Sequence, residues 1–267
     1  MKNSIFITLL LSAILITTGA GAQVITLKQI GKESMLLSSN MGLSIHASAI
    51  LYTIDQTGAI YKTDLSSGDY SRVGKVSFNN LKFFFTINNR LYVIDNDRSM
   101  TQIDPVSGNL SIVSSMGYWV DIVNVVVVAN SFYAIENGAL YKYSGFNTAT
   151  RKQIGESDFY NVGTLIRYET ALYSLTGDGT FYEINTSTGK WKKIAKSRTW
   201  KGNLSAVVKD KLYTIDNAGA LYETSLSDGS KKLIDDTQFK RARSLFEDGG
   251  KLYTSTTTGS LYEIIIN

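Results

Sequence analysis

The chain has 267 residues, of which 43% are hydrophobic and 19% charged, and its formal net charge is +4. This charge is too small, and the lysines are too scattered, to favour nucleic acid or a membrane surface as a partner. The sequence contains no cysteine, which excludes disulfides, thiolate nucleophiles and cysteine ligands for zinc.

The first 22 residues have the pattern of a secretory signal peptide. Lys2 precedes an apolar run from Ile5 to Ile16, and small residues follow up to Ala22. The run is shorter than the about 20 residues that a membrane span needs. We therefore expect cleavage after Ala22, a secreted or periplasmic protein without a transmembrane segment, and one mature domain over residues 23–267.

A repeat of about 40 residues fills the rest of the chain. Each copy begins with a Leu-Tyr or Phe-Tyr doublet, and these doublets start at residues 51, 91, 132, 172, 212 and 252. A second doublet follows each first one after eight or nine residues, at Ile60-Tyr61, Met100-Thr101, Leu140-Tyr141, Phe181-Tyr182, Leu221-Tyr222 and Leu261-Tyr262. Six copies of one unit indicate a repeat architecture.

Each unit reads as four short strands. The runs are rich in β-branched and aromatic residues and are broken by turn sequences such as "QTG", "NAG" and "SDG". In the fifth copy we place strands at 203–209, 211–216, 219–225 and 230–235. Neighbouring Leu and Tyr of a doublet point to opposite faces of a strand, so both faces must be buried. The sequence predicts an all-β fold, a six-bladed β-propeller of four-stranded antiparallel blades.

The two ends of the chain predict how the ring closes. The sixth copy stops after its third strand, whereas "VITLKQIGK" near the N-terminus matches the fourth strands elsewhere, such as "RKQIGE". We expect residues 24–31 to complete the last blade by pairing with residues 260–266. This pairing removes two open sheet edges, with Val24, Ile25, Leu27 and Ile30 half to fully buried.

The repeat pattern, best seen in "LYTIDQTGAIYKTDLSSGDYSRVG", resembles secreted six-bladed propellers of the TolB-like and quinoprotein-repeat kind. It also resembles, less closely, the tectonin and tachylectin-2 lectin repeats. Those lectins carry a tryptophan in nearly every repeat, whereas this chain has only Trp119, Trp191 and Trp200. The resemblance covers the whole mature chain and implies a fold more than a ligand.

A column of polar residues follows each first doublet by four positions, on the face where connectors join one blade to the next. It contains four carboxylates, and its members are Asp55, Asp95, Glu136, Thr176, Asp216 and Thr256. The simpler interpretation is that each side chain accepts a hydrogen bond from a turn N–H two residues later. The alternative is a calcium site built from Asp55, Asp95, Glu136 and Asp216, with Asp178 as a further candidate. We otherwise expect no cofactor.

A column of aromatic residues lies in the connectors, 12 or 13 residues before the next doublet: Phe78, Trp119, Phe159, Trp200 and Phe239. The first blade has Ser38 there. These rings either plug the gap between blades or, if exposed together with the adjacent Tyr160, bind a sugar or a protein. The connectors near Trp200 and Phe239 also carry Arg198, Lys201 and Arg241, which would favour an anionic ligand on that flank.

Enzyme chemistry has little support in the sequence. The sole histidine, His46, falls in an innermost strand, and no Ser-His-Asp set can be assembled around it. We expect a monomeric, non-catalytic binding propeller that recognises a carbohydrate or a protein at the mouth of the central channel. A calcium-dependent hydrolase is the alternative, because six-bladed lactonases hold calcium with carboxylate and amide ligands. A structural module of a cell-envelope complex is the third.

Overall fold

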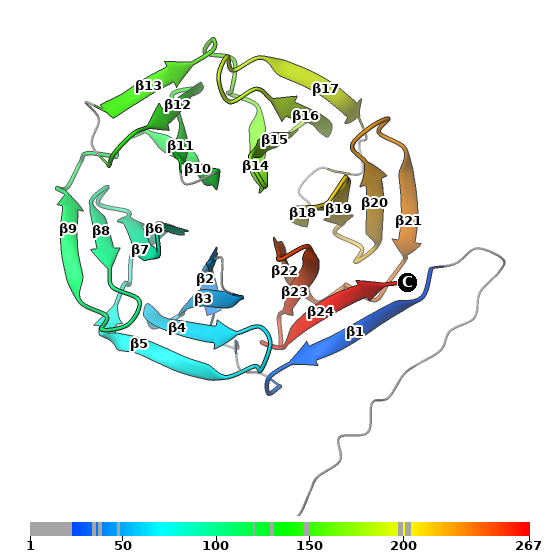
Figure 1. Cartoon of the computed structure of the whole chain (residues 1–267), viewed down its shortest axis with the longest axis horizontal. Helices are drawn as coiled ribbons and strands as arrows, with labels where there is room; N and C mark the ends of the chain where they lie inside the picture. The colour runs from blue at the N-terminus through cyan, green and yellow to red at the C-terminus, as the bar shows by residue number, and fades with distance from the viewer. Residues whose placement is uncertain are drawn as a thin grey trace, which may run out of the picture.

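Six four-stranded antiparallel sheets stand around a common axis, so the predicted six-bladed propeller is confirmed (Figure 1). The computed structural model describes residues 23–33, 36, 39–46, 49–119, 121–128, 131–146, 150–196, 200 and 204–267, with the backbone alone for 39–46. The predicted signal peptide lies outside this range. Within the described part of the chain, no helix has the length and hydrophobicity to cross a membrane.

The blades are numbered by the repeats, and each runs from an inner strand near the axis to an outer strand at the rim. Blade 1 contains β2 (Ser39–His46), β3 (Ile50–Asp55), β4 (Ala59–Asp64) and β5 (Tyr70–Ser77). Blade 2 contains β6 (Leu81–Ile87), β7 (Arg90–Asp95), β8 (Met100–Ile103) and β9 (Leu110–Ser114). Blade 3 contains β10 (Ile122–Val128), β11 (Ser131–Glu136), β12 (Ala139–Tyr143) and β13 (Arg151–Ile154).

The second half of the ring repeats this order. Blade 4 contains β14 (Val162–Tyr168), β15 (Ala171–Thr176), β16 (Thr180–Ile184) and β17 (Trp191–Lys196). Blade 5 contains β18 (Leu204–Val208), β19 (Lys211–Ile215), β20 (Leu221–Ser225) and β21 (Lys231–Asp235). Blade 6 contains β22 (Ala242–Asp248), β23 (Lys251–Thr256), β24 (Leu261–Ile266) and β1 (Ile25–Ile30).

Blade 6 is assembled from both ends of the described chain, as the sequence predicted. Strand β1 pairs antiparallel with β24, from Ile25 opposite Ile266 to Ile30 opposite Leu261 (Figure 1). Ile30 is buried and Ile25 and Leu27 are half-buried, but Val24 is exposed. The burial expected for Val24 was wrong: the residue precedes β1, and although its carbonyl accepts a hydrogen bond from the N–H of Asn267 at 3.1 Å, its side chain stays exposed.

The core consists of layers between consecutive blades rather than one central cluster. One layer joins Tyr52 and Ile54 of blade 1 to Phe84, Leu91 and Val93 of blade 2, and equivalent layers follow around the ring. The tyrosines of all six first doublets are buried beside their leucine or phenylalanine neighbours. Both faces of each second strand are therefore covered, which explains why the doublets recur in every repeat.

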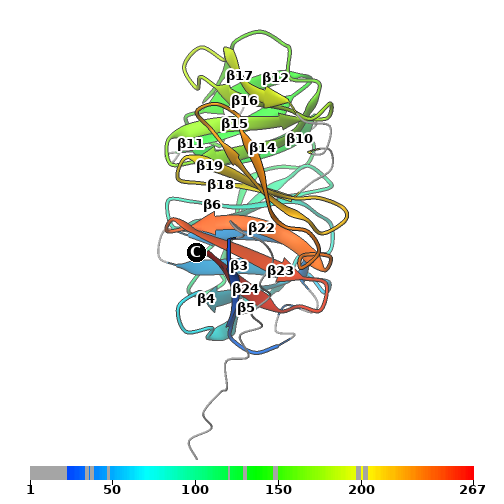
Figure 2. The same ribbon diagram turned by 90° about the vertical axis from the view of Figure 1, so that its right-hand side faces the viewer.

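The ring has two faces, seen edge-on in Figure 2. On the connector face lie the links between blades and the hairpins between second and third strands. On the opposite face lie the hairpins between third and fourth strands, where neighbouring blades approach closely. A Cβ added to Gly68 would lie 2.3 Å from the Cα of Gly31 in the preceding outer-strand segment. Gly68 also has φ 76°, so both the contact and the turn require glycine.

Candidate functional site

The connectors after blades 1, 3 and 5 are each bonded to the two blades that they join. After blade 1, the N–H of Phe78 donates to the carbonyl of Gly58 at 2.8 Å, and the N–H of Asn96 in blade 2 donates to the carbonyl of Asn80 at 2.6 Å. The same two bonds recur after blades 3 and 5, through Phe159 to Gly138, Gly177 to Asn161, Phe239 to Gly219 and Thr257 to Arg241. These bonds hold the connector face in one shape.

The predicted aromatic column lies inside the molecule. Its five rings are at most 9% exposed and pack between consecutive blades; they are Phe78, Trp119, Phe159, Trp200 and Phe239. The indole N–H of Trp119 donates to the hydroxyl of Ser114 at 2.6 Å. This packing agrees with the interpretation that the rings fill the gaps between blades. A ligand on the surface would therefore contact other residues.

Leu36 takes the corresponding position between blades 6 and 1. Its N–H donates to the carbonyl of Gly259 at 2.8 Å, and its side chain is buried among Ile30, Leu51 and Tyr253. The sequence predicted Ser38 in this column, and Ser38 lies outside the described residues. The connector that leads into blade 1 is longer than the others, so counting back from the first doublet gave the wrong residue. The only sequence signal for Leu36 was an apolar residue two positions before Ser38.

The side chains of Asp55 and Asp216 accept hydrogen bonds within their own turns. One oxygen of Asp55 accepts hydrogen bonds from the N–H groups of Thr57 at 2.8 Å and Ala59 at 2.9 Å. One oxygen of Asp216 accepts from Ala218 at 2.9 Å and Ala220 at 3.0 Å. The simpler interpretation of the column, a side chain that caps a turn, is confirmed at these two positions.

Glu136 is occupied within blade 3. Its carboxylate accepts hydrogen bonds from the hydroxyl of Tyr143 and from the guanidinium of Arg151. Burial raises the pKa of Glu136, while the positive charge of Arg151 opposes that rise. A neutralised and buried carboxylate of this kind stabilises the blade and offers little to a ligand.

Asp95 differs from the other carboxylates of the column. In its turn the N–H of Ser99 donates to Asp97 at 2.9 Å, so Asp97 takes the role that Asp55 has in blade 1. The Oδ1 atom of Asp95 is buried and has no hydrogen-bond partner among the described residues. Burial first, and the neighbouring charge of Asp97 second, raise the pKa of Asp95. One oxygen of this carboxylate is therefore buried and unsatisfied.

A pocket of about 280 Å³ opens beside Asp95, between the connector from blade 1 to blade 2 and the second hairpin of blade 2. Its lining consists of Ser77, Phe78, Asn79, Asn80, Asp95 and Asp97. Two carboxylates, two amides and a hydroxyl give it a polar, negatively charged wall. Such a wall suits a cationic group that donates hydrogen bonds to carboxylate and amide oxygens.

The four carboxylates proposed for calcium do not converge. They belong to blades 1, 2, 3 and 5, and among the described residues no three His, Asp or Glu side chains form a group that could hold a metal ion. Asp178 is engaged by the hydroxyl of Thr176 at 2.6 Å and by Lys196 at 3.0 Å. These two contacts hold the pKa of Asp178 well below its usual range.

The basic and aromatic candidates have different positions. Arg241 is exposed on the connector face, while Arg198 and Lys201 lie outside the described residues. Tyr160, beside the buried Phe159, is 75% exposed, and its ring covers Gly138. His46 ends the inner strand β2, as predicted, and its side chain is outside the description. Asn79 and Asn80 were missed, because amides at a connector have no repeating pattern.

No protein-family model and no curated protein matches this chain. Solved structures do, and the resemblance to TolB-like and quinoprotein-type propellers is confirmed as one of fold. A Bacteroides thetaiotaomicron structural-genomics protein of unknown function is 13% identical, with a TM-score of 0.64, over 92% of this chain and 76% of that one.

Two of the other similar structures have functional descriptions. A catalytically inactive virginiamycin B lyase from Staphylococcus aureus, solved with Quinupristin, is 7% identical, with a TM-score of 0.58, over 91% of this chain and 100% of that one. YCF48 from Cyanidioschyzon merolae is 12% identical, with a TM-score of 0.52, over 83% and 80%, and YCF48 has also been solved bound to D1 peptide. At these identities the chain shares a propeller fold with a lyase and with a peptide-binding protein.

Proposed function

We propose that this protein is a non-catalytic, secreted or periplasmic propeller that binds a protein partner through the connector face. The partner inserts a lysine or arginine side chain into the pocket beside Asp95. The observation that carries the proposal concerns Asp95: its buried Oδ1 atom has no partner within the described chain, and the residue is one of those that line that pocket.

The charge of the pocket favours a cation. Asp97 is the one charged neighbour that contributes to the raised pKa of Asp95, and its charge has the same sign. A guanidinium or ammonium group would satisfy both carboxylates, and charge-assisted hydrogen bonds are about twice as strong as neutral ones. The two connector bonds hold Asn79 and Asn80 in place before a ligand arrives, which reduces the entropy lost on binding.

A protein partner is favoured over a sugar because of the aromatic column. Its rings are buried, so they offer no platform for sugar stacking in this conformation. A peptide ligand is also in keeping with YCF48, a propeller solved with D1 peptide, although that likeness concerns the fold. Carbohydrate binding remains the second candidate, supported by one observation, the exposed ring of Tyr160 on the same face.

The test compares the chain without its first 22 residues on two arrays, one of peptides with and without Lys or Arg, and one of glycans. We expect binding to cationic peptides and an affinity loss of at least tenfold in Asp95→Asn, because the amide lacks the charge. The control is Asp69→Asn, which removes an exposed carboxylate on the opposite face. It should bind like the original protein.

Other outcomes identify the alternatives. Glycan binding that Tyr160→Ala abolishes, with no cationic peptide bound, would establish the carbohydrate function instead. Binding or hydrolysis that requires calcium and ends on chelation would support the hydrolase with its carboxylates. Peptide binding that is equal in Asp95→Asn and in the original protein would contradict the proposed pocket.

A further inference from the structure

The outer strand of blade 2 differs from the other five rim strands. An outer strand has one unpaired edge, and proteins commonly place charged residues there to prevent pairing with another chain. Five rim strands follow this rule, with Lys28, Arg72, Lys152, Lys192 and Lys232 among their cations. Strand β9 reads "LSIVS", and no Asp, Glu, Lys or Arg occurs anywhere in residues 105–120.

Blade 2 also lacks the tyrosine that covers the outer strand elsewhere. In blades 1, 3, 4 and 5 the tyrosine of the second doublet contacts the first residue of the fourth strand. The ring distances are 4.7 Å for Tyr61 to Tyr70, 4.7 Å for Tyr141 to Arg151, 5.0 Å for Tyr182 to Trp191 and 3.7 Å for Tyr222 to Lys231. Blade 2 has Thr101 opposite Ile112, with Leu110 at the equivalent of Tyr70.

The consequence is an exposed apolar strip. Leu110 is 46% and Ile112 81% exposed, and two residues apart they lie on the same face of β9. Val106, before the strand, is 88% exposed, and Met116, after it, is 73% exposed. Of the large apolar side chains that are exposed in the described chain, four thus fall within eleven consecutive residues, 106–116. Such clustering on a surface marks an interaction site.

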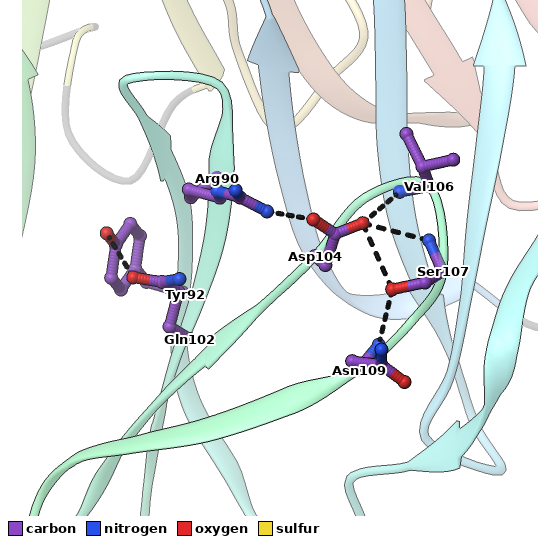
Figure 3. Close-up of polar contacts among 7 residues, drawn as sticks. All are labelled: Arg90, Tyr92, Gln102, Asp104, Val106, Ser107 and Asn109. Atoms are coloured by element: carbon purple, nitrogen blue, oxygen red, sulfur yellow. Dashed lines mark hydrogen bonds and ion pairs between the residues drawn. The ribbon is translucent and has the colours of Figure 1, made fainter.

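Polar contacts tie the hairpin before β9 to Asp104, while the Val106 side chain is exposed (Figure 3). One oxygen of Asp104 accepts hydrogen bonds from the N–H groups of Val106 at 3.0 Å and Ser107 at 2.9 Å. Its other oxygen pairs with Arg90 of β7. The side chain of Val106 points away from this network in Figure 3. These bonds fix the backbone of the hairpin at Val106 and Ser107, next to the start of β9.

We propose that β9 pairs antiparallel with β9 of a second copy of this chain, so that two blades form one eight-stranded sheet across a two-fold axis. A pairing centred on Ile112 places the Ile112 side chains together and sets Leu110 opposite the partner's Ser114. The edge requires an occupant that is extended, apolar and uncharged. Among the rim strands of this chain only β9 has these properties, so the surface is complementary to itself.

Charge also favours this arrangement over other contacts between copies. Each chain has a net charge of +4, and the other five rim strands bring cations to their edges. A contact through β9 keeps those cations apart and leaves no charge buried without a partner. The interface is small, so we expect a dimer with a dissociation constant of about 1–100 µM. This inference replaces the monomer expected from the sequence and does not depend on the proposed partner pocket.

The test measures the molar mass of the chain without its first 22 residues by sedimentation from about 1 to 500 µM, a range that brackets the expected constant. We expect a monomer–dimer equilibrium, weakened at least tenfold in Ile112→Lys. The matched control is Leu233→Lys, because Leu233 has the same position in β21 of blade 5 and is also exposed. It should dimerise like the original protein, and both variants should keep their melting temperatures within a few degrees.

A cross-link gives an independent measurement. Because the chain has no cysteine, Ile112→Cys places two thiols at the proposed axis with no competing thiol. We expect a disulfide-linked dimer on mild oxidation and none with Leu233→Cys. A monomer over the whole concentration range, or a dimer that Ile112→Lys leaves intact, would overturn the proposal, and so would an Ile112-dependent complex with a different protein only.

Discussion

Blade 2 and blade 5 come from the same repeat but use it differently. Blade 5 keeps every element: Asp216 caps its own turn, Gly219 occupies the left-handed turn position, and Tyr222 covers a lysine-rich rim strand. In blade 2 the equivalent residues are Asp95, Arg98 and Thr101. The buried oxygen of Asp95 has no hydrogen-bond partner in the described chain, Arg98 takes the left-handed turn conformation without being glycine, and Thr101 has no ring to cover the rim strand. Residues that keep the repeated role maintain the blade, whereas residues that depart from it are available for binding. Both candidate binding surfaces, the pocket beside Asp95 and the strip along β9, involve blade 2.

Opening the ring should lower the stability of the protein more than any other change, because blades 2 and 5 both depend on the closed ring. Deletion of residues 23–31 removes β1 and exposes the edge of β24. From the burial of Ile25, Leu27 and Ile30 we expect a loss of about 4 kcal/mol, or a melting temperature lower by about 10 °C. Circular dichroism melting would measure this shift. A change of only a degree or two would show that closure contributes little.

The left-handed turn position provides a direct test of the two blades. A Cβ on Gly219 would lie 2.3 Å from the backbone nitrogen of Lys240, and its φ is 85°. Gly219→Ala should therefore lower the free energy of unfolding by about 3 kcal/mol. At the same position in blade 2, Arg98 already has φ 71°, and Arg98→Gly should stabilise the protein by about 1 kcal/mol. Urea unfolding gives both values, and equal effects would contradict the comparison.

The smallest expected effect depends on pH. The pKa of Asp95 is raised in the folded state by burial and by Asp97, so ionisation of this group opposes folding at pH 7. Protonation relieves that penalty as the pH falls through the raised pKa. Asp95→Asn should thus be about 1 kcal/mol more stable than the original protein at pH 7, and this advantage should shrink towards pH 4.

Asp216→Asn is the control for this pH dependence. Its amide oxygen can accept the same two turn bonds from Ala218 and Ala220, so we expect a change of less than about 0.5 kcal/mol. If Asp95→Asn destabilised the protein at pH 7, the charge of Asp95 would favour folding, which would contradict the raised pKa. Loss of peptide binding in a stabilised Asp95→Asn variant would separate function from folding.

Most of the fold could be predicted because each repeat carries its own packing pattern. The doublets locate the second and third strands, and the strands predicted for the fifth copy begin and end within two residues of those observed wherever the structure describes them. Closure by β1 followed from a count of strands at the two ends. Leu36 was not predicted because the connector into blade 1 has a different length, so the spacing to the next doublet that holds in the other repeats points to the wrong residue.

The candidate site was only partly predictable, since a sequence pattern identifies equivalent positions but not their hydrogen bonds. Asp55, Asp95 and Asp216 look alike in the repeat, yet only Asp95 lacks a turn donor, because Asp97 accepts the available N–H of Ser99. The aromatic column was open to two interpretations because a ring gives the same sequence signal in a core and on a surface. The strip along β9 could not be predicted because the sequence shows Thr101 in the doublet column but not that Thr101 lies opposite Ile112 or that Leu110 and Ile112 are exposed.

The close approach of Gly68 to Gly31 has an evolutionary consequence. The same contact recurs between Gly108 and Gly74 and between Gly189 and Gly155, always from one blade to the preceding one. Each contact joins the glycine of the hairpin between the third and fourth strands of one repeat to the glycine of the outer segment of the preceding repeat. A duplicated 40-residue unit would therefore carry both of the glycines that this contact needs. A ring of this kind can gain or lose a whole repeat while the contact between neighbouring blades stays the same. The substitutions that distinguish blade 2 are at positions other than these glycines, so they can accumulate in one repeat without weakening its packing against the next blades.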